Sequence, residues 1–357
     1  MRTLFPSVRR WSERVLVGLL LAVLVPAALG ATATQPDARA PTAGAARPSE
    51  AAPIDSDKLF AAIVRVETRA VPGARSAGTL GAEREGTGVV IGSDGLILTI
   101  GYLLVEAAEV SVTDNRGRTL PANVVGYDHP TGLGLVRTLV PLRIAPIPLG
   151  DPEALAERDP VMIASQSGAD DVSFVWVVSR RAFSGNWEYL LEHAIFTSPP
   201  TSNWSGAALI DKDGRLVGIG SLIVREATEG ETRLPGNVFV PIDLLKPILA
   251  DLVKNGRRAG PARPWLGVAA DEMQGRLIVT RVSPEGPADR AGMKPGDIIL
   301  GVGSDGVRTQ ADFYRKVWNR GNAGDEIPLR VLQDTDVRDI RVRSIDRLQY
   351  FKPRSTY

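Results

Sequence analysis

The chain has 357 residues, 44% of them apolar and 23% charged, and a formal net charge of +1 at pH 7. This length exceeds one ordinary domain, so we expect two or three units. The balanced charge gives no reason to expect a nucleic-acid partner. Cysteine is absent, which excludes a disulfide framework, a thiol nucleophile and cysteine-ligated metal. The two histidines do not pair with carboxylates at metal-ligand spacing, so we expect neither metal nor cofactor.

Residues 1–30 have the composition of an export signal. Arginines precede an apolar run from Val15 to Leu29, and small residues follow that run. The run is shorter than the roughly 20 residues that a membrane span needs. We therefore expect a cleaved signal peptide, with an uncleaved anchor as the alternative, and a periplasmic or cell-envelope location. Residues 31–56 are rich in Ala, Pro and Thr and are predicted to be a disordered linker.

From Leu59 onwards, short apolar segments alternate with turn residues, a pattern typical of β-sandwiches and barrels. Residues 60–66 are apolar, and 73–86 are predicted to be a polar loop. Gly86–Thr99 is the clearest hairpin, with two apolar strands around a Ser-Asp-Gly turn. Two groups of six strands would suit a double barrel with its site between the barrels. The other predicted strands are 110–113, 122–127, 133–137, 161–164, 172–178, 194–196, 208–210, 216–219 and 238–240.

The last third of the chain changes character. Between Pro241 and Lys254 the apolar residues adopt helical spacing, and Asn255-Gly256 is predicted to end that helix. Residues 256–263 are a Gly/Pro/Arg linker to a third unit, and 346–357 are expected to be a tail. The third unit is predicted to contain a short helix after Pro287, a helix capped by Thr309, and strands at 277–282, 327–332 and 337–342.

The stretch Ser-Asn-Trp-Ser-Gly-Ala-Ala-Leu-Ile at 202–210, with the hairpin that follows it, resembles the nucleophile loop of the HtrA/Deg family of trypsin-like serine proteases. Residues 264–345 resemble a PDZ domain. The resemblance implies a mainly β fold, a double β-barrel of the trypsin-like (chymotrypsin) type over 57–255, followed by an α+β PDZ domain. It is weak over 140–195, where 183–189 matches no family motif. We expect that segment and the loop 225–236 to form a partner surface.

The resemblance also implies where the catalytic residues lie. Ser205 takes the nucleophile position. The family histidine lies in a Thr-Asn-Asn-His-Val-Val segment, which here reads Thr-Ile-Gly-Tyr-Leu-Leu, so Tyr102 takes its place. The family aspartate lies in Asp-Pro-x-Thr-Asp-Leu-Ala, which here reads Asp-His-Pro-Thr-Gly-Leu-Gly, so Gly132 takes its place. A serine nucleophile needs a base and a group that orients the base. We therefore predict that Ser205 is inert.

Other positions could change that conclusion. The oxyanion-hole glycine of the family is Asn203 here, and because Asn tolerates positive φ better than most residues, the turn can persist. Tyr102, with an ordinary pKa of about 10, is a poor base near pH 7. His129 is expected to be a surface-loop histidine. His193 is expected to pack on one side of a strand.

The PDZ resemblance implies recognition of peptide C-termini. A peptide would add as a strand beside 266–269, and backbone N–H groups of Trp265, Leu266 and Gly267 would receive its carboxylate, with Val268 completing the segment. Phe313 and Val317, one helical turn apart, would line the side-chain pocket. The alternative is that both side chains fill the domain core.

Three functions follow from these expectations. The first is a catalytically inactive HtrA-like protein that binds peptide C-termini or unfolded proteins as a scaffold, chaperone or regulator of envelope protein quality control, with an active HtrA relative as one conceivable partner. The second is an active serine endopeptidase with a non-standard triad that uses Tyr102, His129 or His193 as base. The third is a structural module that forms homotrimers, as the family often does. The substitutions at Tyr102 and Gly132 favour the first.

Overall fold

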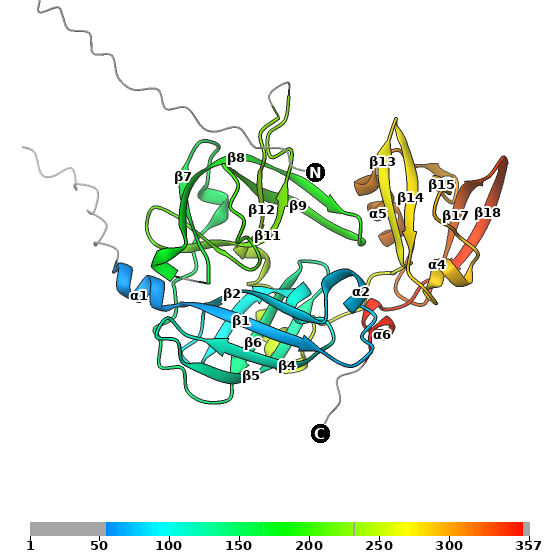
Figure 1. The fold of residues 1–357 in the computed structure, drawn as a ribbon. Coiled ribbons are helices and arrows are strands. Elements are labelled where there is room, and N and C mark those ends of the chain that lie inside the picture. Colours follow the sequence, from blue (N-terminus) through cyan, green and yellow to red (C-terminus); the bar gives the residue numbers. More distant parts are fainter. Residues whose placement is uncertain (1–54, 167, 231–232, 353–357) are drawn as a thin grey trace, which may run out of the picture. The chain divides into compact units, whose positions relative to one another are not determined.

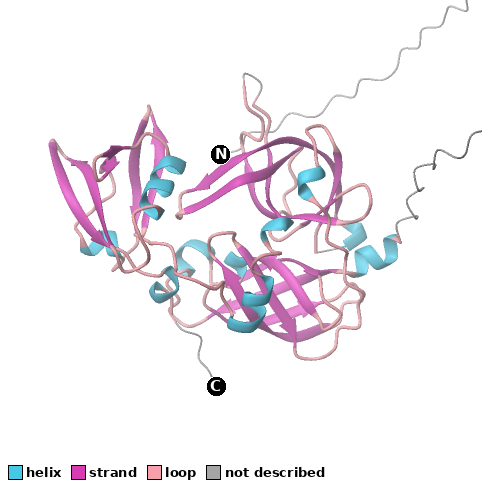
Figure 2. Ribbon diagram, turned by 180° about the vertical axis from the view of Figure 1, so that it is seen from behind, coloured by secondary structure: helices cyan, strands magenta, loops and turns pink. Residues whose placement is uncertain are grey.

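The computed structural model describes residues 55–166, 168–230 and 233–352, and strands predominate in it (Figure 2). The predicted signal segment 1–30, almost all of the predicted linker 31–56 and the last five residues lie outside the described residues. In the described ranges, no helix combines the length and the apolar character that crossing a bilayer requires.

In the described part of the chain, two closed barrels of six antiparallel strands follow one another (Figure 1). Their strand orders are β1-β2-β3-β6-β5-β4 and β10-β11-β12-β9-β8-β7, so the predicted double barrel is confirmed. Closure pairs each strand on both sides and so protects the strand edges. The bounds are β1 Ile63–Ala70, β2 Glu83–Val90, β3 Leu96–Ile100, β4 Ala107–Thr113, β5 Thr119–Asp128, β6 Leu133–Thr138, β7 Pro160–Ala164, β8 Val172–Gly185, β9 Tyr189–Ser198, β10 Ala208–Ile210, β11 Leu216–Val224 and β12 Gly236–Pro241.

Several elements differ from the sequence expectations. Helix α1 (Ser56–Ala61), capped by Asp55, includes the first two residues of the apolar stretch 60–66. The predicted loop 73–86 contains the short helix α2 (Ala77–Leu80) and the beginning of β2. Strands β8 and β9 are much longer than the predicted 172–178 and 194–196, and within them Arg181 stacks its guanidinium 3.7 Å from the centre of the Phe196 ring on the neighbouring strand. That contact lets a charged residue lie within a strand.

The helix predicted over 241–254 is interrupted. A 3₁₀ turn, Ile242–Leu244, is followed by α3 (Leu249–Asn255). Pro247 lies between them, and proline cannot donate a helical hydrogen bond and clashes with the carbonyl of the preceding turn. Gly256 ends α3 as predicted, with φ of +72° and its N–H donating to Leu252 O.

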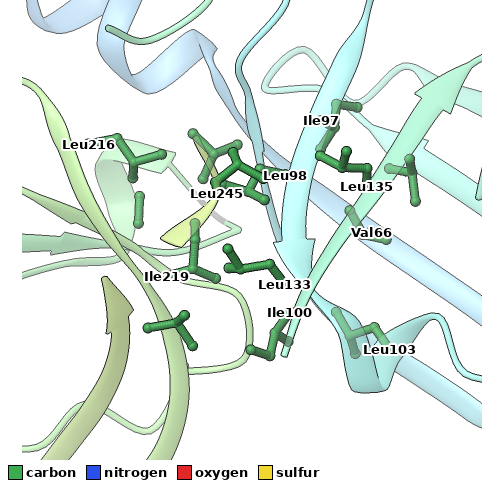
Figure 3. Packing of buried hydrophobic residues seen from close by; sticks show 14 of the residues in the cluster. Val66, Ile97, Leu98, Ile100, Leu103, Leu133, Leu135, Leu216, Ile219 and Leu245 are labelled. Atoms are coloured by element: carbon green, nitrogen blue, oxygen red, sulfur yellow. The ribbon is translucent and has the colours of Figure 1, made fainter. Parts of the chain in front are cut away.

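One buried apolar cluster contains residues of both barrels. Ile100 and Leu133 come from the first barrel, and Leu216 and Ile219 come from the second (Figure 3). Side chains of the segment after β12, including Leu245, belong to the same cluster. Because this core is shared, the loops that carry Tyr102, Gly132 and Ser205 are supported by common packing.

The third unit is a separate sheet with its own buried cluster. The strand order is β13-β14-β15-β17-β18, and β16 pairs with β15. Thr309 caps α5 as predicted, because its Oγ1 accepts a hydrogen bond from Asp312 N. The elements are β13 Val268–Met273, β14 Arg276–Val282, α4 Pro287–Arg290, β15 Ile298–Val302, β16 Asp305–Gly306, α5 Gln310–Trp318, β17 Glu326–Gln333, β18 Asp336–Arg343 and, in the predicted tail, α6 Arg347–Tyr350.

A buried ion pair joins β5 to the segment after α3. The Asp128 carboxylate, with a side chain 2% exposed, accepts hydrogen bonds from Arg258 Nε at 2.7 Å and from its terminal nitrogen at 2.8 Å. Thr131 donates to the same carboxylate through both its N–H and its hydroxyl. The pair therefore fixes the turn that leads to Gly132.

We expect Asp128→Ala to lower the free energy of unfolding by about 2–3 kcal/mol. The loss falls below that of a fully buried pair because the Arg258 side chain is 34% exposed and can be hydrated. Urea unfolding measures the change. Glu83→Ala is the control, since its pair with Arg69 is exposed and contributes under about 1 kcal/mol. Equal losses in the two variants would contradict this account.

Candidate functional site

The structure brings close together the loops that carry Tyr102, Gly132 and Ser205, the three positions that the family resemblance aligns with a catalytic triad. The N–H of Gly101 donates to Gly132 O at 2.6 Å, which holds the residue before Tyr102 against the Gly132 turn. The Tyr102 hydroxyl donates to Ser221 O at 3.2 Å, on β11. Tyr102 is also close enough to Ser205 for that side chain to affect its pKa. These contacts hold Tyr102 between the Gly132 turn and β11.

The hydroxyl of Ser205 is not presented to solvent. Its Oγ is buried and has no hydrogen-bond partner among the described residues. A Cβ built on Gly86 would lie 2.6 Å from that Oγ, so the hydroxyl packs against the backbone of β2. Thr87 N–H donates to Ser205 O at 2.7 Å and ties the loop to the same strand. A nucleophile must approach its substrate to about 3–3.5 Å, which requires exposure.

Tyr102 is poorly suited to accept a proton. Burial raises the pKa of Tyr102 to about 12, and Ser205 and Trp204 oppose the rise only in part. The phenol therefore stays protonated near pH 7. A general base works best when its pKa is near the operating pH. In this arrangement Tyr102 is a hydrogen-bond donor to Ser221 rather than a base for Ser205.

Tyr189 fills the space beside Gly132. Gly132 has φ of +75°, and a Cβ added there would lie 2.9 Å from the Tyr189 hydroxyl oxygen. That hydroxyl donates to Thr131 O at 2.7 Å, and the ring is buried. Burial raises the pKa of Tyr189, so the phenol is neutral. The sequence did not indicate a role for Tyr189, because it is the last residue of the segment 183–189, which matches no family motif.

Asn203 does not adopt the conformation that a glycine would provide. It is not among the non-glycine residues with positive φ in the described ranges, so the expectation that the turn persists through positive φ at this position is wrong. The reason is local bonding. Asn203 Nδ2 donates to Asp171 at 2.7 Å, and Asn203 O accepts from the Ser165 hydroxyl at 2.9 Å.

Both histidines differ from expectation. His129 is not a free surface-loop residue, because its ring packs edge-on against Tyr127 at 4.8 Å and stacks on Phe351 at 5.7 Å. Burial, assisted by Arg347, lowers the pKa of His129 well below its ordinary value, so its ring is neutral at pH 7. His193 is exposed rather than packed.

The exposure of His193 follows from a bulge. The pairing of β8 with β9 shifts between Arg181 and Phe183, and Glu192 and His193 lie at that irregularity. Within the described residues, no cluster of three histidine or acidic side chains is arranged to hold a metal ion.

The segment predicted to bind a peptide carboxylate already holds a carboxylate of the same chain. The N–H groups of Leu266, Gly267 and Val268 donate to the side chain of Glu188 at distances of 2.6–3.1 Å. The predicted donor set is displaced by one residue, because Trp265 N–H donates to Ile345 O at 3.0 Å instead.

Phe313 and Val317 are core residues of the third unit. Each is 1% exposed and belongs to the same buried cluster as Leu266. Both side chains therefore fill the core of the domain, which is the alternative that the sequence had left open.

Comparisons with known proteins agree with this architecture. Residues 86–219 match the trypsin-like peptidase domain family, and residues 264–343 match the PDZ domain family. The chain is 28% identical over 274 residues to a probable periplasmic serine endoprotease DegP-like of Halomonas elongata, covering 72% of this chain and 55% of that protein. It is 29% identical over 229 residues to serine endoprotease DegS of Haemophilus influenzae, covering 60% of this chain and 64% of that protein. The chain thus spans between half and two thirds of the length of these relatives.

Solved structures support the fold. The HtrA-type protease AlgW with a decapeptide has a TM-score of 0.50 and 19% identity, covering 84% of this chain and 99% of that chain. A variant of that protease with a tripeptide has a TM-score of 0.51 and 19% identity, covering 84% and 98%. The chain therefore comprises a trypsin-like peptidase domain followed by one PDZ domain, and its homologues are DegP/HtrA serine proteases.

Proposed function

We propose that this is an exported HtrA-like protein whose peptidase domain does not hydrolyse peptides. It binds peptide C-termini or unfolded proteins and serves as a scaffold, chaperone or regulator in envelope protein quality control. The observation that carries the proposal is the partly buried phenol of Tyr102, which lies at the position of the family's histidine and donates to Ser221 O. Burial raises the pKa of Tyr102 to about 12, which removes the base that Ser205 would need.

The expected size of the defect supports this proposal. In subtilisin, loss of the catalytic histidine alone lowers turnover by about 10⁶, nearly as much as loss of the whole triad. The residual rate depends on the oxyanion hole. Here Asn203 lacks the positive φ available to glycine, so that residual contribution is weakened as well.

Export is supported by two observations. Residues 1–30 have signal-like composition, and the Halomonas elongata relative is named as periplasmic. Binding of peptides is supported by the PDZ family match over 264–343. Assembly as a homotrimer, or with an active relative, is a further part of the proposal.

An active endopeptidase with a non-standard triad is the second candidate. The observation in its favour is that the matched relatives are named serine endoproteases and that Ser205 is retained. Activity would require the Ser205 hydroxyl to leave its position against Gly86 and meet a base. Neither Tyr102 nor His129 provides a pKa near 7 in this structure.

We expect purified protein and its Ser205→Ala variant to release peptides from labelled casein at the same background rate from pH 6 to 9. Without a base, the residual rate is expected to be about 10⁻⁶ of that of an intact serine protease. A fluorophosphonate probe, which labels activated serines, is expected to leave Ser205 unmodified. Cleavage or labelling that disappears in the variant would establish the second candidate, and Tyr102→Phe, His129→Gln and His193→Gln would then identify the base.

Restoring the triad is expected to fail. Gly132→Asp, alone or with Tyr102→His, should yield no hydrolysis and should lower the free energy of unfolding by about 3 kcal/mol. The loss combines strain at positive φ with overlap against Tyr189. Gly117→Asp separates the two effects, since Gly117 has φ of +76° and an added Cβ meets no atom within 4 Å. We expect a loss of about 1 kcal/mol for Gly117→Asp. Equal losses by urea unfolding would show that Tyr189 does not obstruct position 132.

A further inference from the structure

The loop between β8 and β9 has a residue in an unusual backbone conformation. Asn186, Trp187 and Glu188 form the loop, and Glu188 has φ of +58°. Hairpin loops of three residues normally place glycine at such a left-handed position. A glutamate there is strained and persists only when surrounding contacts hold it. The contacts made by this loop are therefore informative.

The Glu188 carboxylate lies in a ring of backbone donors. Gly267 N–H donates to Oε1 at 2.6 Å and Val268 N–H at 3.0 Å, and Leu266 N–H lies within 3.1 Å of both oxygens. Consecutive N–H groups that converge in this way form an anion-binding nest, and Gly267, with φ of +79°, permits the turn. The side chain of Glu188 thus occupies the position expected for the C-terminal carboxylate of a peptide.

An apolar side chain accompanies the carboxylate. Leu190, two residues after Glu188, is 6% exposed and belongs to the buried cluster of the third unit with Phe313 and Val317. Although Leu190 is part of β9, its side chain packs in the PDZ core rather than in the core of the barrels. A carboxylate next to an apolar side chain is what a peptide C-terminus presents to a PDZ domain.

The hairpin is held by polar contacts with α5 as well. The Tyr314 hydroxyl donates to Gly185 O at 2.9 Å and accepts from Glu188 N–H at 3.2 Å. Arg315 forms two hydrogen bonds with the carboxylate of Glu192 on β9. These contacts connect the hairpin to the helix that flanks the expected peptide groove.

The edge of the groove is also engaged. Gln310, at the start of α5, donates from its side chain to Ala270 O at 2.5 Å, and its N–H donates to Glu272 at 2.8 Å. An added peptide strand needs free backbone groups along β13. The carbonyl of Ala270 is already bonded to α5, so strand addition at this position must compete with Gln310.

The charge of Glu188 is balanced locally. Arg347 on α6 is partly buried, donates to Trp187 O at 2.9 Å and favours the charged form of Glu188. Burial nevertheless raises the pKa of Glu188 to about 7. A buried carboxyl group is costly unless donors surround it, so this docking is a specific arrangement rather than incidental surface contact.

We infer that the β8–β9 loop is an internal ligand of the PDZ domain. Glu188 takes the carboxylate site, so a partner with a free carboxylate and an apolar last residue binds only by displacing the hairpin. This inference rests on the proposed peptide-binding function. The apparent Kd for such a partner equals the intrinsic Kd divided by the fraction of molecules in which the hairpin is undocked.

Hydrogen exchange tests the internal contact directly. Glu188→Ala removes the carboxylate without introducing glycine at the left-handed position. Glu192→Ala removes a carboxylate from the same hairpin but leaves the donors at 266–268 untouched. We expect amide exchange at Leu266, Gly267 and Val268 to rise at least about tenfold in Glu188→Ala and to stay near wild type in Glu192→Ala. Unchanged protection in Glu188→Ala would overturn the inference.

Peptide binding tests the competition. The probe is a fluorescein-labelled pool of decapeptides that end in Val, Leu, Ile or Phe with a free carboxylate, and an amidated pool is the control. In the full chain, Glu188→Ala should bind the free-carboxylate pool at least about tenfold more tightly than wild type or Glu192→Ala. Glu188→Gln, which keeps one acceptor oxygen, should be intermediate. The amidated pool should bind to none of them.

The outcomes separate the two proposals. Equal affinity of wild type and Glu188→Ala for the free-carboxylate pool overturns the internal ligand and leaves peptide binding intact. The other outcome is that hydrogen exchange shows the amides at 266–268 to be free in Glu188→Ala, yet this variant binds no peptide. That result overturns peptide binding by this domain, and the proposed competition with it.

Discussion

Strand β9 begins with a buried phenol, and the residue before it is a buried carboxylate. Tyr189 bonds to Thr131 and fills the space beside Gly132, whereas Glu188 bonds to the amides of the PDZ carboxylate segment. Two adjacent residues of one hairpin therefore lie at the two predicted functional positions, Gly132 in the peptidase domain and the carboxylate segment of the PDZ domain. Through them, the packing of this hairpin links the two domains.

The hairpin contacts both domains because adjacent residues bond to each of them. On the barrel side, Tyr189 is buried in the shared core, where a ring of this size contributes a large apolar area. On the PDZ side, Glu188 replaces water with three backbone donors, which compensate part of its desolvation. Displacing the loop would forfeit these hydrogen bonds, so an incoming carboxylate must supply equivalent ones to the same amides.

The fold was largely predictable from the sequence, and the site was predictable only in part. Turn residues at regular spacing predicted both barrels, and short motifs predicted the PDZ elements. Pro247 was visible in the sequence and could have indicated the broken helix. The exposure of His193 and the packing of His129 depend on a bulge and on Phe351, far along the chain. Glu188 and Leu266 are separated by 78 positions, so no local pattern could reveal their contact.

The glycine at 132 makes this position resistant to change by single substitutions. Tyr189 occupies the volume that any side chain at position 132 would need. A complete triad at these positions would require Tyr189 to withdraw from the core, an acid to be accepted at φ of +75°, and an imidazole at position 102. The first two changes each reduce stability and none of the three alone supplies a triad, so only the simultaneous combination could gain anything that offsets its cost.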